Sequence, residues 1–102
     1  MRTLVAGHRY QLDNFEGSKP QTLQFIHKEP RHAGTTEMMT LEDGTTNEEV
    51  LRVLIDRMEF LQDRCPCKEN LGALDHMRGA LALLEQRTLN RQSRGVEGKH
   101  QE

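Results

Sequence analysis

The sequence predicts an α+β protein: a small N-terminal antiparallel β-sheet packed with a C-terminal antiparallel hairpin of two helices, assembled as an oligomer. Residues 8–42 contain short segments that alternate apolar and polar side chains, and residues 43–95 contain two helical periodicities separated by a Cys-Pro-Cys break. Only 34% of residues are hydrophobic and Trp is absent, so the core is thin and burial between copies is expected. One domain over residues 1–102 is predicted, with residues 96–102 as a tail.

The strand predictions rest on alternation with period 2. Residues 9–13 place Tyr10 and Leu12 on one face, and residues 22–27 form the best strand pattern in the chain. A third short strand is expected at residues 37–41, while residues 1–8 are either an edge strand or a loose lead-in. Residues 29–36 contain Pro and Gly among polar residues and predict a loop, whose basic members either line a site or are solvated.

The first helix begins with a capping box, Thr46-x-x-Glu49, and ends before Pro66. Its apolar residues recur at i, i+3, i+4, i+7 and i+10, which is the pattern of a helix with one buried face. They are Leu51, Leu54, Ile55, Met58 and Leu61.

The second helix is expected to begin near Glu69 or Asn70 and to end before Gly95, a natural residue just past a helix end. Gly72 and Gly79 lie inside it, where they indicate either close approach of another helix or simple tolerance. The short break makes the two helices antiparallel neighbours. The apolar stripe is Leu71, Leu74, Met77, Leu81 and Leu84.

Bulk charge and missing motifs exclude several classes of function. A net charge of -2 and a pI near 6.2 argue against a DNA-binding protein. The chain has neither an apolar run long enough to span a membrane nor the apolar core of a signal peptide, so a soluble cytosolic protein is expected. No nucleophile–base pair or phosphate-binding fingerprint is found, so no catalytic residue, no enzyme activity and no cofactor are predicted.

Cys65 and Cys67 flank Pro66 and are the two cysteines of the chain. A disulfide across one intervening residue would be strained, and structural zinc needs four ligands. A zinc site completed by His76 or His27 is the lesser alternative, and a turn with incidental thiols is the favoured interpretation. No metal site is therefore predicted.

Arginines near an aromatic ring indicate a site for an anionic aromatic ligand. Arg57, Phe60 and Arg64 share one helix face, and Arg87, Arg91 and Arg94 lie within about 60° of one another on the second helix. A ring stacks on a nucleobase and guanidinium groups bind phosphate. The alternative is that Phe60 is a core residue and the arginines pair with the acidic first helix.

Five strings occur in an order and at separations that resemble the phage anti-Thoeris sponge proteins, whose helical hairpin is shared with phage anti-CBASS cyclic-dinucleotide sponges. The resemblance covers roughly residues 8 to 101, and its strength lies in the ordered set. The strings are Phe15-Glu16-Gly17, Gln24-Phe25-Ile26, the run from Asp43 to Leu51, Leu54-Ile55-Asp56-Arg57, and Arg94-Gly95-Val96-Glu97-Gly98.

The resemblance implies a protein that binds and sequesters a nucleotide messenger without degrading it, in the cytoplasm of the infected bacterial host. The implied ligand is a cyclic ADP-ribose isomer such as glycocyclic ADP-ribose, made by a TIR-domain immune enzyme, with cyclic di- or trinucleotides as further ligands at separate interfaces. The implied assembly is a homodimer or a hexamer with pockets between protomers. The alternative function is an oligomeric module that docks a host protein through its arginine stripe.

The resemblance also implies particular binding residues. The stacking aromatic falls on Phe60, the polar residue at the start of the second helix on Asn70, and the arginine near its end on Arg87. The closing motif contributes residues expected to border the pocket: Arg94, Gly95 and Glu97, beside Arg91. Arg57 and Arg64 are candidates for a second nucleotide site. Departures at Gln92 and Lys99 affect the expected ligand preference more than the fold.

Overall fold

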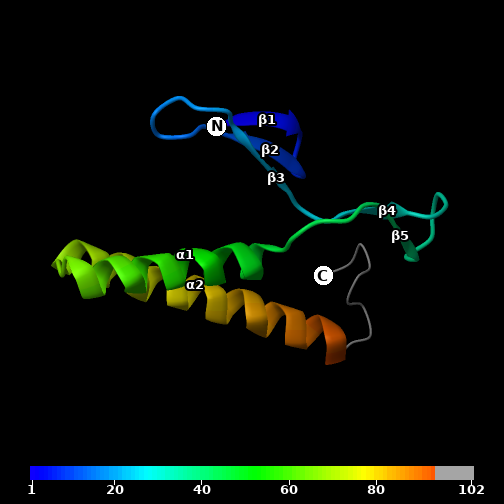
Figure 1. The fold of residues 1–102 in the computed structure, drawn as a ribbon. Helices are drawn as coiled ribbons and strands as arrows, with labels where there is room; N and C mark the ends of the chain where they lie inside the picture. The colour runs from blue at the N-terminus through cyan, green and yellow to red at the C-terminus, as the bar shows by residue number, and fades with distance from the viewer. Residues whose placement is uncertain (94–102) are drawn as a thin grey trace. The chain divides into compact units, whose positions relative to one another are not determined.

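The computed structural model describes residues 1–93, and contacts divide the chain into two compact units, Met1–Thr46 and the part from Asn47 on (Figure 1). All five strands of the described part belong to the first unit and both helices to the second. The elements are β1 (Arg2–Val5), β2 (Arg9–Leu12), β3 (Gln21–Gln24), β4 (His27–Pro30), β5 (Met38–Glu42), α1 (Asn47–Arg64) and α2 (Lys68–Ser93). The α+β class is confirmed, whereas the single domain, the packing of sheet on hairpin and the oligomer stay predictions.

The first three strands form an antiparallel sheet in the order β1-β2-β3. Thr3 pairs with Tyr10, and Tyr10 pairs in turn with Leu23. The β1–β2 turn contains Gly7 at a φ of 77°, a conformation that suits glycine, and the His8 amide donates to the Val5 carbonyl at 2.9 Å. The first residues of the chain are therefore an edge strand.

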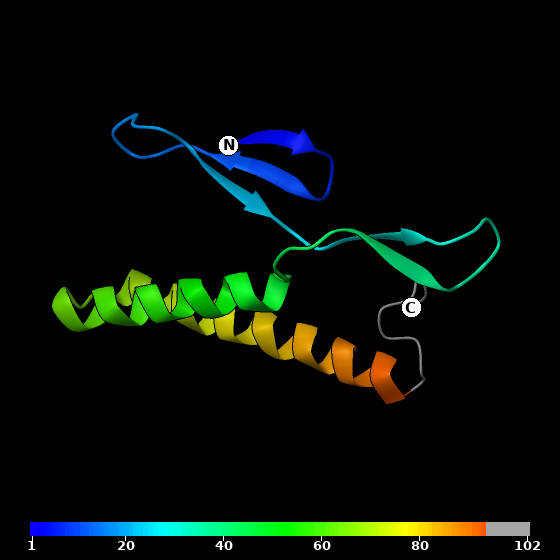
Figure 2. The same cartoon turned by 45° about the vertical axis from the view of Figure 1, so that its right-hand side comes forward.

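The strand expected at residues 22–27 is not continuous, and this prediction was wrong. At Phe25 the chain changes partners, because the Phe25 amide donates to the His8 carbonyl at 2.7 Å and Phe25 forms a parallel bridge with Thr45. The Ile26 amide then donates to the Thr45 carbonyl at 2.9 Å. The following residues form β4, which pairs with β5 in a separate two-stranded sheet (Figure 2). The expected sheet of three strands is thus replaced by two sheets.

Gly44 lies at the point where these segments meet. The Thr45 amide donates to the Gln24 carbonyl at 2.9 Å, which draws the chain before α1 against the end of β3. A Cβ atom on Gly44 would lie 2.6 Å from the carbonyl carbon of Phe25, far inside van der Waals contact. Only glycine permits this close approach without a shift of the backbone.

The predicted loop at residues 29–36 begins later than expected, because Glu29 and Pro30 belong to β4. Arg31 and Glu37 close the connection between β4 and β5. The Arg31 amide donates to the Glu37 carbonyl at 2.8 Å, and the two side chains form an ion pair at 3.3 Å. Arg31, one of the basic residues of the predicted loop, thus lies exposed at the end of β4.

The two helices run antiparallel and pack along one face of each (Figure 1). Ile55 of α1 and Leu74 of α2 are the buried hydrophobic residues of the described chain, and Leu74 is only 2% exposed. The predicted stripes are largely confirmed, with two exceptions, Leu54 and Leu71, which are 44% and 53% exposed. The half-buried members are Leu51, Met58, Leu61, Met77, Leu81 and Leu84.

Two ion pairs mark the register of the helices, Arg52 with Glu85 at 3.3 Å and Glu59 with Arg78 at 3.5 Å. In this register Leu71 lies level with the connecting segment rather than with α1, which explains its exposure. The connection is held by Gln62, whose side-chain oxygen accepts a hydrogen bond from the Cys67 amide at 3.0 Å. The second helix begins at Lys68, slightly before the predicted start.

Neither described helix is long and apolar enough to cross a membrane.

Candidate functional site

Phe60 and Arg64 form an exposed ring-and-cation pair on α1. The Phe60 side chain is 53% exposed, and the Arg64 guanidinium carbon lies 4.5 Å from the ring centroid. Phe60 follows the buried Ile55 by five residues, which turns it about 140° around the helix, away from α2. Phe60 is therefore a surface residue within the chain, as a stacking platform requires, and not part of the hairpin core.

Arg57 shares this face of α1, one turn before Phe60, and is exposed. Neither Arg57 nor Arg64 forms an ion pair with another residue of the described chain. The ion pairs between the helices use Arg52 and Arg78 instead. The interpretation in which Arg57 and Arg64 are neutralised within the hairpin is thus not supported, and both guanidinium groups face solvent with their donors available.

The α2 residues of the predicted site lie at opposite ends of that helix. Asn70 is half-buried in the first turn, whereas Arg87 is exposed and Arg91 is half-buried near the end. Seventeen residues separate Asn70 from Arg87, or about 25 Å at 1.5 Å per residue. One small ligand cannot contact both side chains within a single chain.

Phe60 lies on α1, at a level between the two ends of α2, and its ring is turned away from α2. The Glu59–Arg78 ion pair places Phe60 near the level of Met77, about 15 Å along the axis from Arg87. The structure therefore brings Phe60 and Arg64 together, and along the helix axis it separates Phe60 from Asn70 by about 10 Å and from Arg87 by about 15 Å in one chain. Arg94, Gly95 and Glu97 lie outside the described residues.

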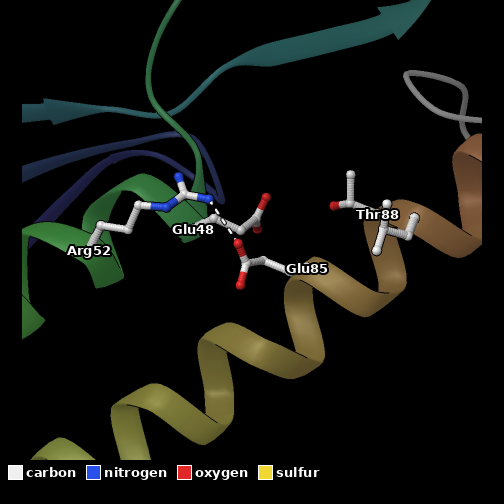
Figure 3. Close-up of a pocket in the computed structure, with 5 residues that line it drawn as sticks. Glu48, Arg52, Glu85 and Thr88 are labelled. Atoms are coloured by element: carbon white, nitrogen blue, oxygen red, sulfur yellow. Dashed lines mark hydrogen bonds and ion pairs between the residues drawn. The ribbon is translucent and has the colours of Figure 1, made fainter.

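A solvent-open pocket of about 230 Å³ lies between the start of α1 and the end of α2, and sequence reasoning missed it. Arg52 from α1 and Glu85 from α2 point toward one another across it and form the ion pair described above (Figure 3). The lining residues are Glu48, Arg52, Glu85, Thr88 and Leu89.

The charge of this pocket does not suit a phosphate. Its two carboxylates, Glu48 and Glu85, outnumber the guanidinium of Arg52, which is already paired with Glu85 and lies 3.8 Å from Glu49. An anionic ligand would have to displace these carboxylates. No sequence pattern indicates this pocket, because its walls depend on which turn of α2 faces Glu48 and Arg52.

One group in the part of the chain that the structure describes has the composition of a metal site. His8, His27 and Glu29 place their ligand atoms within 4.8 Å of one another. The exposed thiols of Cys65 and Cys67 take no part in it. Spacing along the chain did not indicate this group, because nineteen residues separate the two histidines.

Comparison with known proteins relates the chain to a phage protein. The chain is 37% identical over 60 residues to Thoeris anti-defense 1 from Bacillus phage SBSphiJ7. The alignment covers 58% of this chain and 42% of the relative, so the chain spans less than half of the relative's length. No family model matches the chain. Over this part of the chain, the predicted resemblance to the anti-Thoeris family is confirmed.

Proposed function

We propose, from this relationship to a phage anti-Thoeris protein, that the chain counters the Thoeris defence by binding and sequestering its nucleotide messenger without cleaving it. The messenger is a cyclic ADP-ribose isomer of the glycocyclic type, made by a TIR-domain immune enzyme. The protein acts in the cytoplasm of the infected bacterium. The relationship to Thoeris anti-defense 1 supports the anti-defence role, and the residues of the hairpin support the messenger-binding part.

The observation that carries the proposal is the exposed ring of Phe60 with the Arg64 guanidinium over it. A cyclic ADP-ribose isomer offers an adenine to stack and a diphosphate to neutralise. Stacking of a base on an aromatic side chain contributes about 1–3 kcal/mol. One guanidinium group can donate two parallel hydrogen bonds to the oxygens of a phosphate. Phe60 and Arg64 thus present both kinds of group within one turn of α1.

The separation of Phe60, Asn70 and Arg87 favours a site built from more than one copy of the chain. Because about 25 Å of helix separates Asn70 from Arg87, a pocket that uses both ends needs a second hairpin. Exposed apolar side chains of the helices supply surface for such contacts, among them Leu71, which is 53% exposed. The proposed assembly is a homodimer or a hexamer, in which Arg57 is available to a cyclic di- or trinucleotide at another interface.

Sequestration requires no catalytic group. A protein that holds the messenger lowers its free concentration by mass action, so affinity and abundance decide the effect. Side chains fixed on helices bind tightly because little conformational freedom is lost on binding. The chain is accordingly proposed to be a binding protein and not an enzyme.

Isothermal titration against cyclic ADP-ribose isomers and cyclic di- and trinucleotides tests this function. We expect saturable binding of at least one cyclic ADP-ribose isomer by the purified protein. Absence of heat with every ligand, together with capture of a specific host protein by wild type but not by Arg87→Ala, would support the docking alternative.

A further inference from the structure

The unit Met1–Thr46 has no buried hydrophobic side chain, since the two of the described chain, Ile55 and Leu74, both belong to the helical hairpin. Segments of this size rarely fold on apolar burial alone and usually need a disulfide, a metal ion or another subunit. A disulfide is not available to this unit, because Cys65 and Cys67 lie beyond it. Another kind of cross-link would therefore have a large effect on its stability.

His8 and His27 lie together where the two sheets of this unit meet. Their rings stack with centroids 3.6 Å apart and 7° between the planes. His8 follows the β1–β2 turn, and its carbonyl accepts the Phe25 amide. His27 begins β4, two residues after that contact. The backbone thus holds two half-buried imidazoles against each other from different sheets.

Glu29 supplies a carboxylate on the same side. It follows His27 by two residues in β4, so both side chains share one face of the strand. The Glu29 Oε1 atom lies 2.9 Å from the Nε2 atom of His27. The His27 side chain is 19% exposed and that of Glu29 is 49% exposed, so the cluster is open to solvent on the carboxylate side.

We propose that His8, His27 and Glu29 bind one divalent transition-metal ion of the zinc class, and that this ion ties the two sheets together. Two imidazole nitrogens and a carboxylate oxygen form a ligand set that suits Zn²⁺ or its neighbours in the first transition series. With bonds of about 2.0–2.2 Å, tetrahedral ligand atoms lie roughly 3.4 Å apart. The three atoms, within 4.8 Å of one another, reach this spacing through side-chain rotation.

Binding of the ion changes the stack of the two rings. The lone pairs of an imidazole lie in the plane of its ring, so parallel rings must tilt before both nitrogens point at one ion. The Nε2 atom of His27 exchanges its contact with Glu29 for the metal, and the carboxylate stays beside it as the third ligand. Water completes the fourth position on the open side.

The metal-free protein, prepared with a chelator, is titrated with Zn²⁺ by calorimetry. We expect one Zn²⁺ ion per chain and a loss of affinity of more than about 10-fold in His27→Ala, since even supporting residues of metal sites change affinity by that factor. Matched controls are His76→Ala, which removes an exposed histidine on α2, and the Cys65→Ser/Cys67→Ser double variant. Both are expected to bind as wild type does.

Cobalt and tyrosine signals keep the test decisive if His27→Ala fails to fold. Glu29→Gln preserves size and removes the charged ligand, so it should also weaken binding.

Co²⁺ bound to wild type should give visible ligand-field bands without a thiolate charge-transfer band. Tyr10, the single tyrosine of the chain, should unfold at a higher denaturant concentration with Zn²⁺ than without it. Absence of Zn²⁺ binding, unchanged binding in both His27→Ala and Glu29→Gln, or loss of binding in the cysteine variant would overturn the proposal. None of these outcomes bears on messenger binding.

Discussion

The Arg64 guanidinium lies over one face of the Phe60 ring, 4.5 Å from its centroid, on the side of α1 turned away from α2. A cation above an exposed ring contributes about 0.5–1 kcal/mol, enough to bias the ring's orientation without burying it. The Phe60 side chain remains 53% exposed, so a planar group can reach the ring. Ring and cation are thus already in place before a ligand arrives, which lowers the entropic cost of binding.

Phe60→Leu is expected to weaken messenger binding and leave folding intact. The variant keeps an apolar side chain and loses the π face, so it removes about 1–3 kcal/mol of stacking. The corresponding loss of affinity is between about 5-fold and about 150-fold, measured by calorimetry. Leu83→Ala is the matched control, because it alters another exposed apolar residue of the hairpin. Equal losses in both variants would argue against stacking on Phe60.

Arg87→Ala is expected to weaken binding by roughly 10-fold or more, because a charge-assisted hydrogen bond contributes about 1.5–3 kcal/mol. The side chain is exposed, so the denaturation midpoint should not change. Arg78→Ala removes the same charge from the same helix at a position paired with Glu59, and it should bind the messenger as wild type does. A loss in Arg78→Ala equal to that in Arg87→Ala would point to general charge attraction.

Leu74→Ala is expected to destabilise the hairpin by about 2–5 kcal/mol, because truncating a buried leucine removes apolar contacts and leaves a cavity. Leu71→Ala, on the same helix but 53% exposed, should change stability by no more than about 0.5 kcal/mol. Urea unfolding followed by helical circular dichroism measures both. A large effect of Leu71→Ala in a dimeric sample would show that Leu71 packs against another copy.

Gly44→Ala is expected to destabilise the strand unit by about 1–3 kcal/mol, because the added Cβ collides with the Phe25 backbone. The fluorescence of Tyr10 reports on this unit, since its ring lies edge-on to that of Phe25 at 6.0 Å between centroids. The midpoint of the Tyr10 signal should fall while the helical signal stays near that of wild type. Equal shifts in both signals would mean that the two units unfold together.

Gly79→Ala, in contrast to Gly44→Ala, is expected to increase stability. A Cβ atom at Gly79 meets nothing within 4 Å in the chain, so the exchange should stabilise α2 by about 0.5–1 kcal/mol through helix propensity. Urea unfolding and sedimentation of the variant are measured together. Destabilisation accompanied by loss of the oligomer would instead reveal close approach of another helix at this glycine.

The helical hairpin followed from sequence because its signals are local. The spacing of Leu51, Ile55 and Met58 fixes the inward face of α1, and Pro66 fixes its end. The strand that breaks at Phe25 could not be read in this way. The alternation of apolar and polar side chains continues through Phe25. The backbone there nevertheless changes its pairing partner to Thr45, twenty residues away, and local periodicity does not predict such a long-range change.

The candidate site was predictable in its residue types more than in its geometry. Spacing placed Phe60 and Arg64 on one face, and the structure confirms that they meet. The pocket lined by Arg52 and Glu85 depends on helix register, which sequence did not supply. Likewise, His8 reaches His27 only because the chain turns back through two sheets.

Recovery of the ligand after binding tests the central claim most directly. Protein is mixed with an excess of glycocyclic ADP-ribose, freed of unbound ligand, denatured by heat, and the released nucleotide is identified by mass spectrometry. Sequestration without cleavage predicts that the released molecule is intact and stoichiometric with the binding sites, and that Phe60→Leu releases much less. Release of linear ADP-ribose or another product, or of no nucleotide at all, would contradict the account.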